Sequence, residues 1–260
     1  MSLVLFEQFG PVGKVTLNNP DQLNAMTPEM GNALSAMVDQ VNQNLDLRVV
    51  VITGAGRAFS AGGDLQFILD HTKKSFEENK QEMVEFYAKF LKLRDITVPT
   101  IAALNGHAIG AGLLIALACD LRIAATEAKL AANFAKLGLS SGMGGLYWLT
   151  RLAGPALAAE LLFTGKAISA DEALHLRLVN AVYPAAEVLN KAMGMAEQIA
   201  LNSPIALKIL KKGVQRAVTA SLKDIIDYEA KGQATTFLTE DLKEGIKAIQ
   251  EKREPRFVGK

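Results

Sequence analysis

Two glycine-rich segments contain the residue types that best suit ligand binding. Gly54 to Leu65 reads GAGRAFSAGGDL, and Asn105 to Asp120 reads NGHAIGAGLLIALACD. Side chains this small let a ligand reach main-chain N–H groups, and the N-terminus of a helix adds a favourable dipole. Such segments are suited to holding an oxygen atom that carries negative charge. Glycine and alanine serve tight packing equally well, so the residues alone leave packing open as the alternative.

Two other interpretations of the glycines can be tested on spacing. A dinucleotide-binding fingerprint needs G-x-G-x-x-G, but Phe59 and Ile115 stand where the third glycine would be. Residues 138–142 match the G-x-S-x-G of a serine hydrolase, yet the stretch before them is not strand-like and only His175 follows them. Ser140 is better explained as a loop residue, and a serine hydrolase stays a remote alternative.

The elements that must position these segments alternate between strands and helices. Short, β-branched stretches at residues 12–17, 48–53 and 99–104 predict strands, and the second is apolar enough to be covered on both faces. Thr27-Pro28-Glu29 predicts a helix start, and residues 76–93 predict a further helix. Strands that alternate with helices indicate an α/β fold with mostly parallel pairing.

The last third of the chain carries helix signals only. Ser203, Ser221 and Thr239 each precede residues typical of a first helical turn. We expect an α/β core over residues 1–185 and a helical C-terminal region over residues 186–260.

Composition narrows the class of protein. A chain of 260 residues, half of them apolar, can bury a large core. The 28 basic and 27 acidic residues nearly cancel and no basic block stands out, so nothing points to nucleic acid.

The single cysteine, Cys119, excludes an intrachain disulfide and is typical of a buried small hydrophobe in a reducing compartment. The start of the chain does not resemble a signal peptide, and the longest apolar stretch, 108–119, is shorter than the roughly 20 residues of a spanning helix. We expect a cytoplasmic protein that binds neither nucleic acid nor membrane, and no cysteine and histidine spacing suggests a metal site.

An ordered set of motifs is similar to the crotonase superfamily, which contains the enoyl-CoA hydratases and isomerases. The motifs are AFSAGGDL, PTIAALNGHAIGAGLLIALACDLRIA, and FAKLGLSSGMGGLYWLTRLAG followed by LLFTGKAISADEALHLRLVNAVYP. The resemblance runs from Val4 to the EKR segment at 251–253. It implies an α/β fold, a crotonase-type spiral of ββα units with a helical C-terminal trimerisation region, assembled as a homotrimer or a dimer of trimers. It also implies an acyl-CoA thioester as substrate, with no separate cofactor, in fatty-acid or related acyl-CoA metabolism.

The resemblance assigns a role to the small residues. In this family two main-chain N–H groups bind the thioester oxygen as it becomes an enolate, and motif position gives these groups to Ala61 and Ala111. One such donor is typically worth about 3–4 kcal/mol in the transition state. The resemblance further implies that the substrate is bound by Ala58, Gly62, Gly63, Asp64, Leu65, Gly110, Leu114, Asn133, Phe134 and Lys252.

The chain departs from the family where the acids should be. The positions that match the two catalytic glutamates of the hydratases hold Leu114 and Phe134, and a third acid position, used in one isomerase branch, falls at Gly142-Met143. Hydration needs a base for the water and an acid for the α-carbon, and a 1,3 proton shift needs at least one shuttle. None of these side chains transfers a proton, so we expect weak or absent hydratase activity.

Three explanations of the missing acids stay open. A base from elsewhere in the pocket could replace them. Alternatively, loss of carbon dioxide from a malonyl-type thioester would form the enolate without a base, and Leu114 and Phe134 would suit the apolar surroundings that this reaction favours. The protein could also bind acyl-CoA without converting it. The candidates for a replacement base are Asp64, Asp70, His71, His107, Asn133, Ser140, Ser141 and Tyr147.

The nucleotide part of CoA has two candidate contacts. Lys252 matches the position from which relatives reach the CoA phosphates, sometimes across a subunit boundary, and a lysine can act there as a point charge. Arg57, in the loop before AFSAGGDL, is a second candidate. An ordinary solvated charge is the alternative for Lys252.

Overall fold

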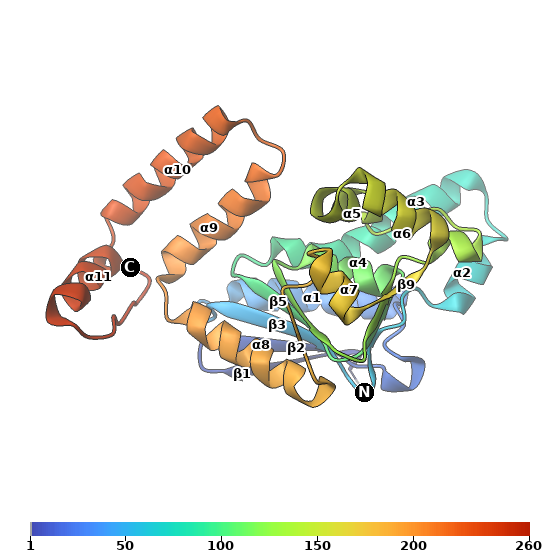
Figure 1. Cartoon of the computed structure of the whole chain (residues 1–260), viewed down its shortest axis with the longest axis horizontal. Helices are drawn as coiled ribbons and strands as arrows, with labels where there is room; N and C mark the ends of the chain where they lie inside the picture. The colour runs from blue at the N-terminus through green and yellow to red at the C-terminus, as the bar shows by residue number, and fades with distance from the viewer. Residues whose placement is uncertain (1) are drawn as a thin grey trace.

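The computed structural model describes residues 2–260 and contains two β-sheets surrounded by helices (Figure 1). The large sheet has the strand order β1-β2-β3-β5-β7-β10, with β1 antiparallel to β2 and the other neighbours parallel. Its strands are β1 (Val4–Phe9), β2 (Val12–Leu17), β3 (Val49–Gly54), β5 (Thr100–Leu104), β7 (Leu121–Ala125) and β10 (Ala181–Tyr183). The small sheet has the order β4-β6-β8-β9, formed by β4 (Ala58–Ser60), β6 (His107–Ile109), β8 (Lys129–Ala131) and β9 (Ala167–Ser169).

A repeated unit generates both sheets. The pairs β3–β4, β5–β6 and β7–β8 each place a first strand in the large sheet and a second strand in the small sheet, and a helix follows. Every residue of β3 and β5 is buried, because layers of side chains and helices cover both faces of these strands. The expected spiral of ββα units is therefore confirmed.

Helices cover the sheets. The first five are α1 (Pro28–Gln43), α2 (Leu65–His71), α3 (Phe76–Leu91), α4 (Ala111–Ala118) and α5 (Gly145–Ala153). The next are α6 (Pro155–Thr164), α7 (Ala170–His175) and α8 (Ala185–Ala200), and short 3₁₀ helices lie at Pro20–Gln22, Lys92–Asp95 and Phe134–Leu137. Thr27 caps α1 as predicted, because its hydroxyl accepts a hydrogen bond from the N–H of Met30 at 3.3 Å. Cys119, just after α4, is buried as expected, and burial raises the pKa of its thiol to about 12.

The C-terminal region consists of helices, as the sequence predicts. α8 packs on the large sheet through an alanine-rich face that includes Ala192 and Ala196, both inaccessible to solvent. The following three helices, α9 (Pro204–Ala217), α10 (Leu222–Phe237) and α11 (Glu240–Glu251), extend away from the core (Figure 1). We call α9–α11 the C-terminal arm. Ser203, Ser221 and Thr239 cap its helices, which confirms the three predicted starts.

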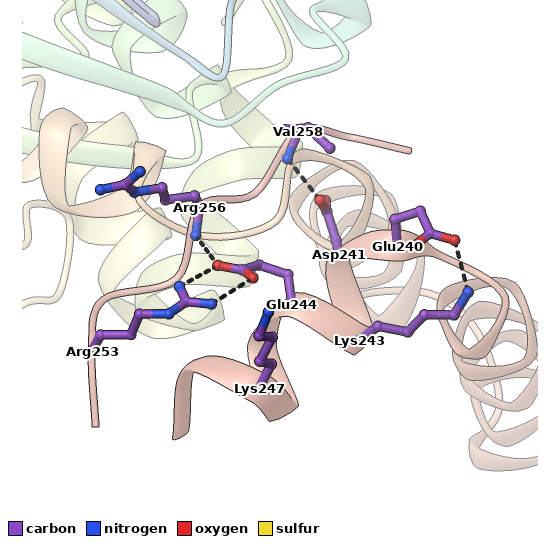
Figure 2. A pocket seen from close by; sticks show the side chains of 8 residues that line it. All are labelled: Glu240, Asp241, Lys243, Glu244, Lys247, Arg253, Arg256 and Val258. Atoms are coloured by element: carbon purple, nitrogen blue, oxygen red, sulfur yellow. Dashed lines mark hydrogen bonds and ion pairs between the residues drawn. The ribbon is translucent and has the colours of Figure 1, made fainter. Parts of the chain in front are cut away.

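Charged groups fix the C-terminal arm at both ends. Lys211 of α9 is buried, and its ammonium group lies 3.0 Å from the Asp120 carboxylate and donates to the Val98 carbonyl at 2.8 Å. At the far end, the carboxylate of Glu244 accepts two hydrogen bonds from Arg253, at 2.6 and 2.9 Å (Figure 2). Asp241 accepts from the N–H of Val258 at 2.7 Å, so the chain end is tied back onto α11 (Figure 2).

No helix among residues 2–260 combines the length and the apolar composition needed to cross a membrane.

Candidate active site

A cavity of about 980 Å³ lies where the two glycine-rich segments meet α2 and α3. The glycine-rich segments contribute Ala61, Gly62, Gly63, Asp64, Leu65, Gly110 and Ala111. The helices α2 and α3 contribute Phe67, Ile68, His71, Met83, Phe86 and Tyr87, and the segment after β8 contributes Asn133, Phe134 and residues 137–143. The main chain of the two glycine-rich segments therefore forms one side of the cavity, and mainly apolar side chains form the other side.

The segment after β4 presents a different main-chain N–H from the one predicted. The N–H of Ala61 donates to the carbonyl of Leu23 at 2.9 Å and is not available to a ligand. Met26 forms a single parallel β-bridge with Gly63. In this bridge the N–H of Met26 donates to the carbonyl of Gly62 at 2.7 Å, and the N–H of Asp64 donates to the carbonyl of Met26 at 3.2 Å. Gly63 lies between these two bonds, so its own N–H points away from Met26, and no acceptor within residues 2–260 takes it. The structure thus corrects the assignment of Ala61: the free N–H at this wall belongs to Gly63.

Asn24, which sequence reasoning missed, holds this segment in place. It is fully buried, and its amide nitrogen donates to the carbonyl of Ala58 at 2.8 Å and of Ala55 at 2.9 Å. The Ser60 hydroxyl donates to the carbonyl of Asn24 at 2.8 Å. These bonds fix the direction of the strand immediately before the free N–H.

Gly62 brings the two glycine-rich segments together. Its φ is +93°, a value that favours glycine. A Cβ at this position would lie 2.6 Å from the carbonyl oxygen of Ile109 and 3.3 Å from the nitrogen of Ala111, so only a glycine permits this approach.

Ala111 is the first residue of α4, and Gly110 precedes it with φ +53°. The N–H groups of a first helical turn have no acceptor inside the helix. Because α4 begins at Ala111, this N–H lies at the positive end of the helix dipole. The N–H groups of Gly63 and Ala111 therefore adjoin the same cavity and provide a site for a partly negative oxygen.

The three positions that lack an acid differ in their surroundings. Phe134 and Gly142 line the cavity, as predicted for Phe134. Leu114 does not: it is inaccessible to solvent, and its side chain packs beneath Gly145, where a Cβ would lie 2.8 Å from it. Leu114 was predicted to contact the substrate, and the structure places it behind the cavity wall instead. The reason is that Gly145 lets the loop close over this leucine.

Asp64 is the only carboxylate among the described residues that line the cavity. One of its oxygens accepts a hydrogen bond from the N–H of Phe67 at 2.8 Å, so Asp64 caps α2. This hydrogen bond gives Asp64 a structural role.

The other candidates for a replacement base divide into two groups. Asn133, Ser140, Ser141 and His71 line the cavity, whereas Asp70, His107 and Tyr147 do not. Asp70 pairs with Lys73 at 3.0 Å, and the Nδ1 of His107 accepts from the N–H of Lys129 at 3.0 Å. Tyr147 stacks against Arg151 at 3.6 Å from the ring centre. These last three were wrong as pocket residues, because motif proximity along the chain does not fix where a side chain points.

His71 lines the cavity, and both of its ring nitrogens lie close to polar groups of α2 and α3. Nδ1 lies 2.7 Å from the carbonyl oxygen of Phe67, and Nε2 is buried 3.3 Å from a carboxylate oxygen of Glu82, which also pairs with Lys74. The imidazole therefore belongs to the packing between α2 and α3.

Tyr87 also lines the cavity and was not among the residues predicted from the sequence. It lies on α3, and its hydroxyl makes no hydrogen bond within residues 2–260. A Cβ on Gly142 would lie 2.6 Å from that hydroxyl oxygen, so the glycine makes room for it. Burial raises the pKa of Tyr87 above its ordinary value, and the phenol is protonated at neutral pH.

Three remaining predicted positions lie outside the cavity. Ala58 is buried in β4, where its carbonyl accepts from Asn24. Arg57 is exposed in the preceding turn. Lys252 ends α11, and Figure 1 shows α11 and α2 at opposite ends of the molecule. A contact between Lys252 and a ligand in this cavity therefore requires a second copy of the chain.

The serine hydrolase alternative does not fit the structure. A 3₁₀ helix at Phe134–Leu137, not a strand, precedes Ser140. His175 lies on α7, bonded to the carbonyl of Asp171 at 2.7 Å, and is not among the cavity residues.

Comparison with known proteins identifies the family to which this fold belongs. The enoyl-CoA hydratase/isomerase family model matches residues 7–260. The chain is 37% identical over 256 residues to "Probable enoyl-CoA hydratase echA8" of Mycobacterium bovis, covering 98% of this chain and 97% of the relative. It is 34% identical to the short-chain-enoyl-CoA hydratase of Clostridium acetobutylicum, covering 96% and 95%. A crystal structure of an enoyl-CoA hydratase subunit from Geobacillus kaustophilus superposes with a TM-score of 0.92 at 38% identity, covering 99% and 98%.

The chain belongs to the enoyl-CoA hydratase/isomerase family, within the crotonase superfamily. It is therefore an enzyme of the enoyl-CoA hydratase/isomerase type.

Proposed function

We propose that the cavity binds an acyl-CoA thioester and that the N–H groups of Gly63 and Ala111 stabilise the enolate formed from it. The observation that carries this proposal is the close approach of Gly62 to Ala111, which sets two unpaired N–H groups at one wall of the cavity. As the thioester becomes an enolate, its oxygen gains charge, and donors already in place stabilise that charge without reorganisation. Small residues around both donors let the thioester lie against the main chain.

The lack of a free carboxylate favours chemistry that needs no general base. Phe134 faces the cavity, Leu114 fills the space beneath its wall, and the one lining carboxylate, Asp64, caps a helix. We therefore propose decarboxylation of a malonyl-type thioester as the reaction. The bond from the α-carbon to the carboxylate breaks, carbon dioxide leaves, and the electron pair moves into the thioester as the enolate. An apolar wall destabilises the departing carboxylate relative to neutral carbon dioxide.

The exposed apolar side chains of the C-terminal arm support a homo-oligomer. Phe237, Leu238 and Ile249 are 64%, 86% and 79% exposed, and a second copy of the chain would cover them. We propose a homotrimer or a dimer of trimers on this basis.

A mass-spectrometric screen of saturated, unsaturated and carboxylated CoA esters tests the reaction. We expect loss of 44 mass units, that of carbon dioxide, from malonyl- or methylmalonyl-CoA and little gain of water by crotonyl-CoA. Rapid hydration of crotonyl-CoA would contradict the proposal. If CoA esters raise the melting temperature and stay chemically unchanged, the protein is a binding homologue without turnover, because a ligand that binds only the folded state stabilises it.

A further inference from the structure

The enolate left after decarboxylation needs a proton at its α-carbon, and the lining residues offer few donors. One oxygen of Asp64 accepts the N–H of Phe67 in a helix cap, and Nδ1 of His71 is bonded to the Phe67 carbonyl, while its Nε2 is buried 3.3 Å from Glu82. The O–H groups of the cavity belong to Thr72, Ser140, Ser141 and Tyr87. A phenol is a much stronger acid than an aliphatic hydroxyl. Tyr87 is thus the strongest acid among the hydroxyl groups of the cavity.

Tyr87 lies beside the Gly142–Gly145 loop, which packs on α4. Its hydroxyl lies against Gly142, the N–H of Gly145 donates to Gly142 at 2.9 Å, and Gly145 packs on Leu114. Leu114 is one helical turn after Ala111 on α4. The phenol therefore approaches the cavity from α3, across the Gly142–Gly145 loop from the helix that carries one of the two N–H groups.

Apolar side chains pack beside the half-buried phenol. Phe86 packs edge-on to Tyr87 at 6.3 Å between ring centres, and Met83 lies one turn earlier on the same helix and also lines the cavity. The Tyr87 hydroxyl has no hydrogen-bond acceptor within residues 2–260, so its hydrogen is free for a ligand.

We propose that Tyr87 is the catalytic acid that delivers a proton to the α-carbon of the enolate. This assignment rests on the proposed function. After carbon dioxide leaves, the electron pair of the enolate forms the new C–H bond with the phenolic proton, and the phenolate recovers a proton from water. Because a fixed donor attacks one face of a planar enolate, the product carries the new hydrogen in one configuration.

The test uses methylmalonyl-CoA in D₂O with the full chain and its Tyr87→Phe variant. Wild-type protein is expected to give propionyl-CoA with one deuterium at C2, mainly in one configuration. The variant is expected to give a nearly equal mixture of both configurations, with kcat lowered about 10²-fold and KM changed much less. Tyr147→Phe is the matched control, because it removes the same hydroxyl outside the cavity, and it should behave as wild type.

The two possible failures are distinguishable. Wild-type turnover together with unchanged rate and configuration in Tyr87→Phe would overturn the assignment of Tyr87 alone. A wild-type protein that neither releases carbon dioxide nor exchanges the α-hydrogens of propionyl-CoA with D₂O would overturn the proposed function, and the role of Tyr87 with it. Unchanged melting temperature of Tyr87→Phe shows that any loss comes from chemistry and not from unfolding.

Discussion

The cavity wall and the C-terminal arm use opposite means to make a functional surface. At the wall, Gly62 and Ala111 bring main-chain groups together, and the residues next to them in the chain, Ala61, Gly63, Gly110 and Gly112, are small. In the arm, large apolar side chains such as Leu238 stay exposed, while charged groups such as Glu244 hold the chain end. The wall is formed within one chain, whereas the proposed assembly would cover the arm with a second copy. Substitutions should therefore act on ligand binding in the first region and on assembly in the second.

The largest effect is expected from Gly62→Ala. The added Cβ would lie 2.6 Å from the Ile109 carbonyl, so the segment must move away from Ala111 and the two N–H groups separate. Loss of one such donor typically lowers turnover by about 10²–10³-fold. We expect a loss of this size in kcat, together with weaker binding of CoA esters by calorimetry.

Gly154→Ala controls for backbone strain. Its φ of +82° imposes a similar cost on alanine, but a Cβ there meets no atom within 4 Å. This variant should lose stability and keep its affinity for CoA esters. If the two variants bound CoA esters equally well, the close approach at Gly62 would have no part in ligand binding.

A smaller effect, confined to assembly, is expected from Leu238→Asp combined with Ile249→Asp. Both side chains are more than three-quarters exposed on the arm, and a charge there would be buried against a second copy. Sedimentation velocity should show the mass fall from a multiple of 27.9 kDa towards that value.

Leu45→Asp is the matched control for the arm, because Leu45 is 82% exposed but lies just after α1 on the core. It should leave the mass unchanged. An unchanged mass in the arm variant as well would argue against the arm as the subunit contact.

The smallest effect concerns the ion pair at the chain end. The side-chain hydrogen bonds from Arg253, followed by the N–H of Arg256, lower the pKa of Glu244 to about 2. Because the folded-state pKa is below the ordinary value, the stabilisation is present above about pH 4.5. It is lost as the pH falls through 2. The gap in melting temperature between wild type and Glu244→Gln should therefore narrow below pH 4.5.

Glu240→Gln provides the comparison for this ion pair, since Glu240 pairs with Lys243 on an exposed helical turn. Its melting temperature should differ little from wild type at any pH, because exposed pairs contribute little. If the difference in melting temperature between wild type and Glu244→Gln stayed constant with pH, this carboxylate would not be stabilised by Arg253.

Regular elements could be predicted from the sequence because their signals are local. The strand at residues 12–17 was predicted with its observed bounds, and Thr27 marked the start of α1. The residues of the candidate site were harder to predict. Motif position gave the correct segment but the wrong N–H, because the N–H of Ala61 is bonded to the Leu23 carbonyl, whereas the N–H of Gly63, after the turn at Gly62, is free. No sequence pattern reports that turn.

Side-chain contacts across the cavity were also beyond the sequence. Tyr87 sits on an amphipathic helix, where aromatic residues normally serve packing, and only the space left by Gly142 shows that its hydroxyl faces the cavity. Leu114 lies in a motif whose relatives use that position for chemistry, yet here Gly145 covers it. In both cases a glycine distant along the chain decides the role of the side chain.

The most direct test of the central claim is a crystal structure of the protein with a bound acyl-CoA thioester. The proposed function predicts the thioester oxygen within hydrogen-bond distance, about 2.7–3.1 Å, of both the Gly63 and the Ala111 nitrogens. A thioester oxygen that points away from both nitrogens would contradict it.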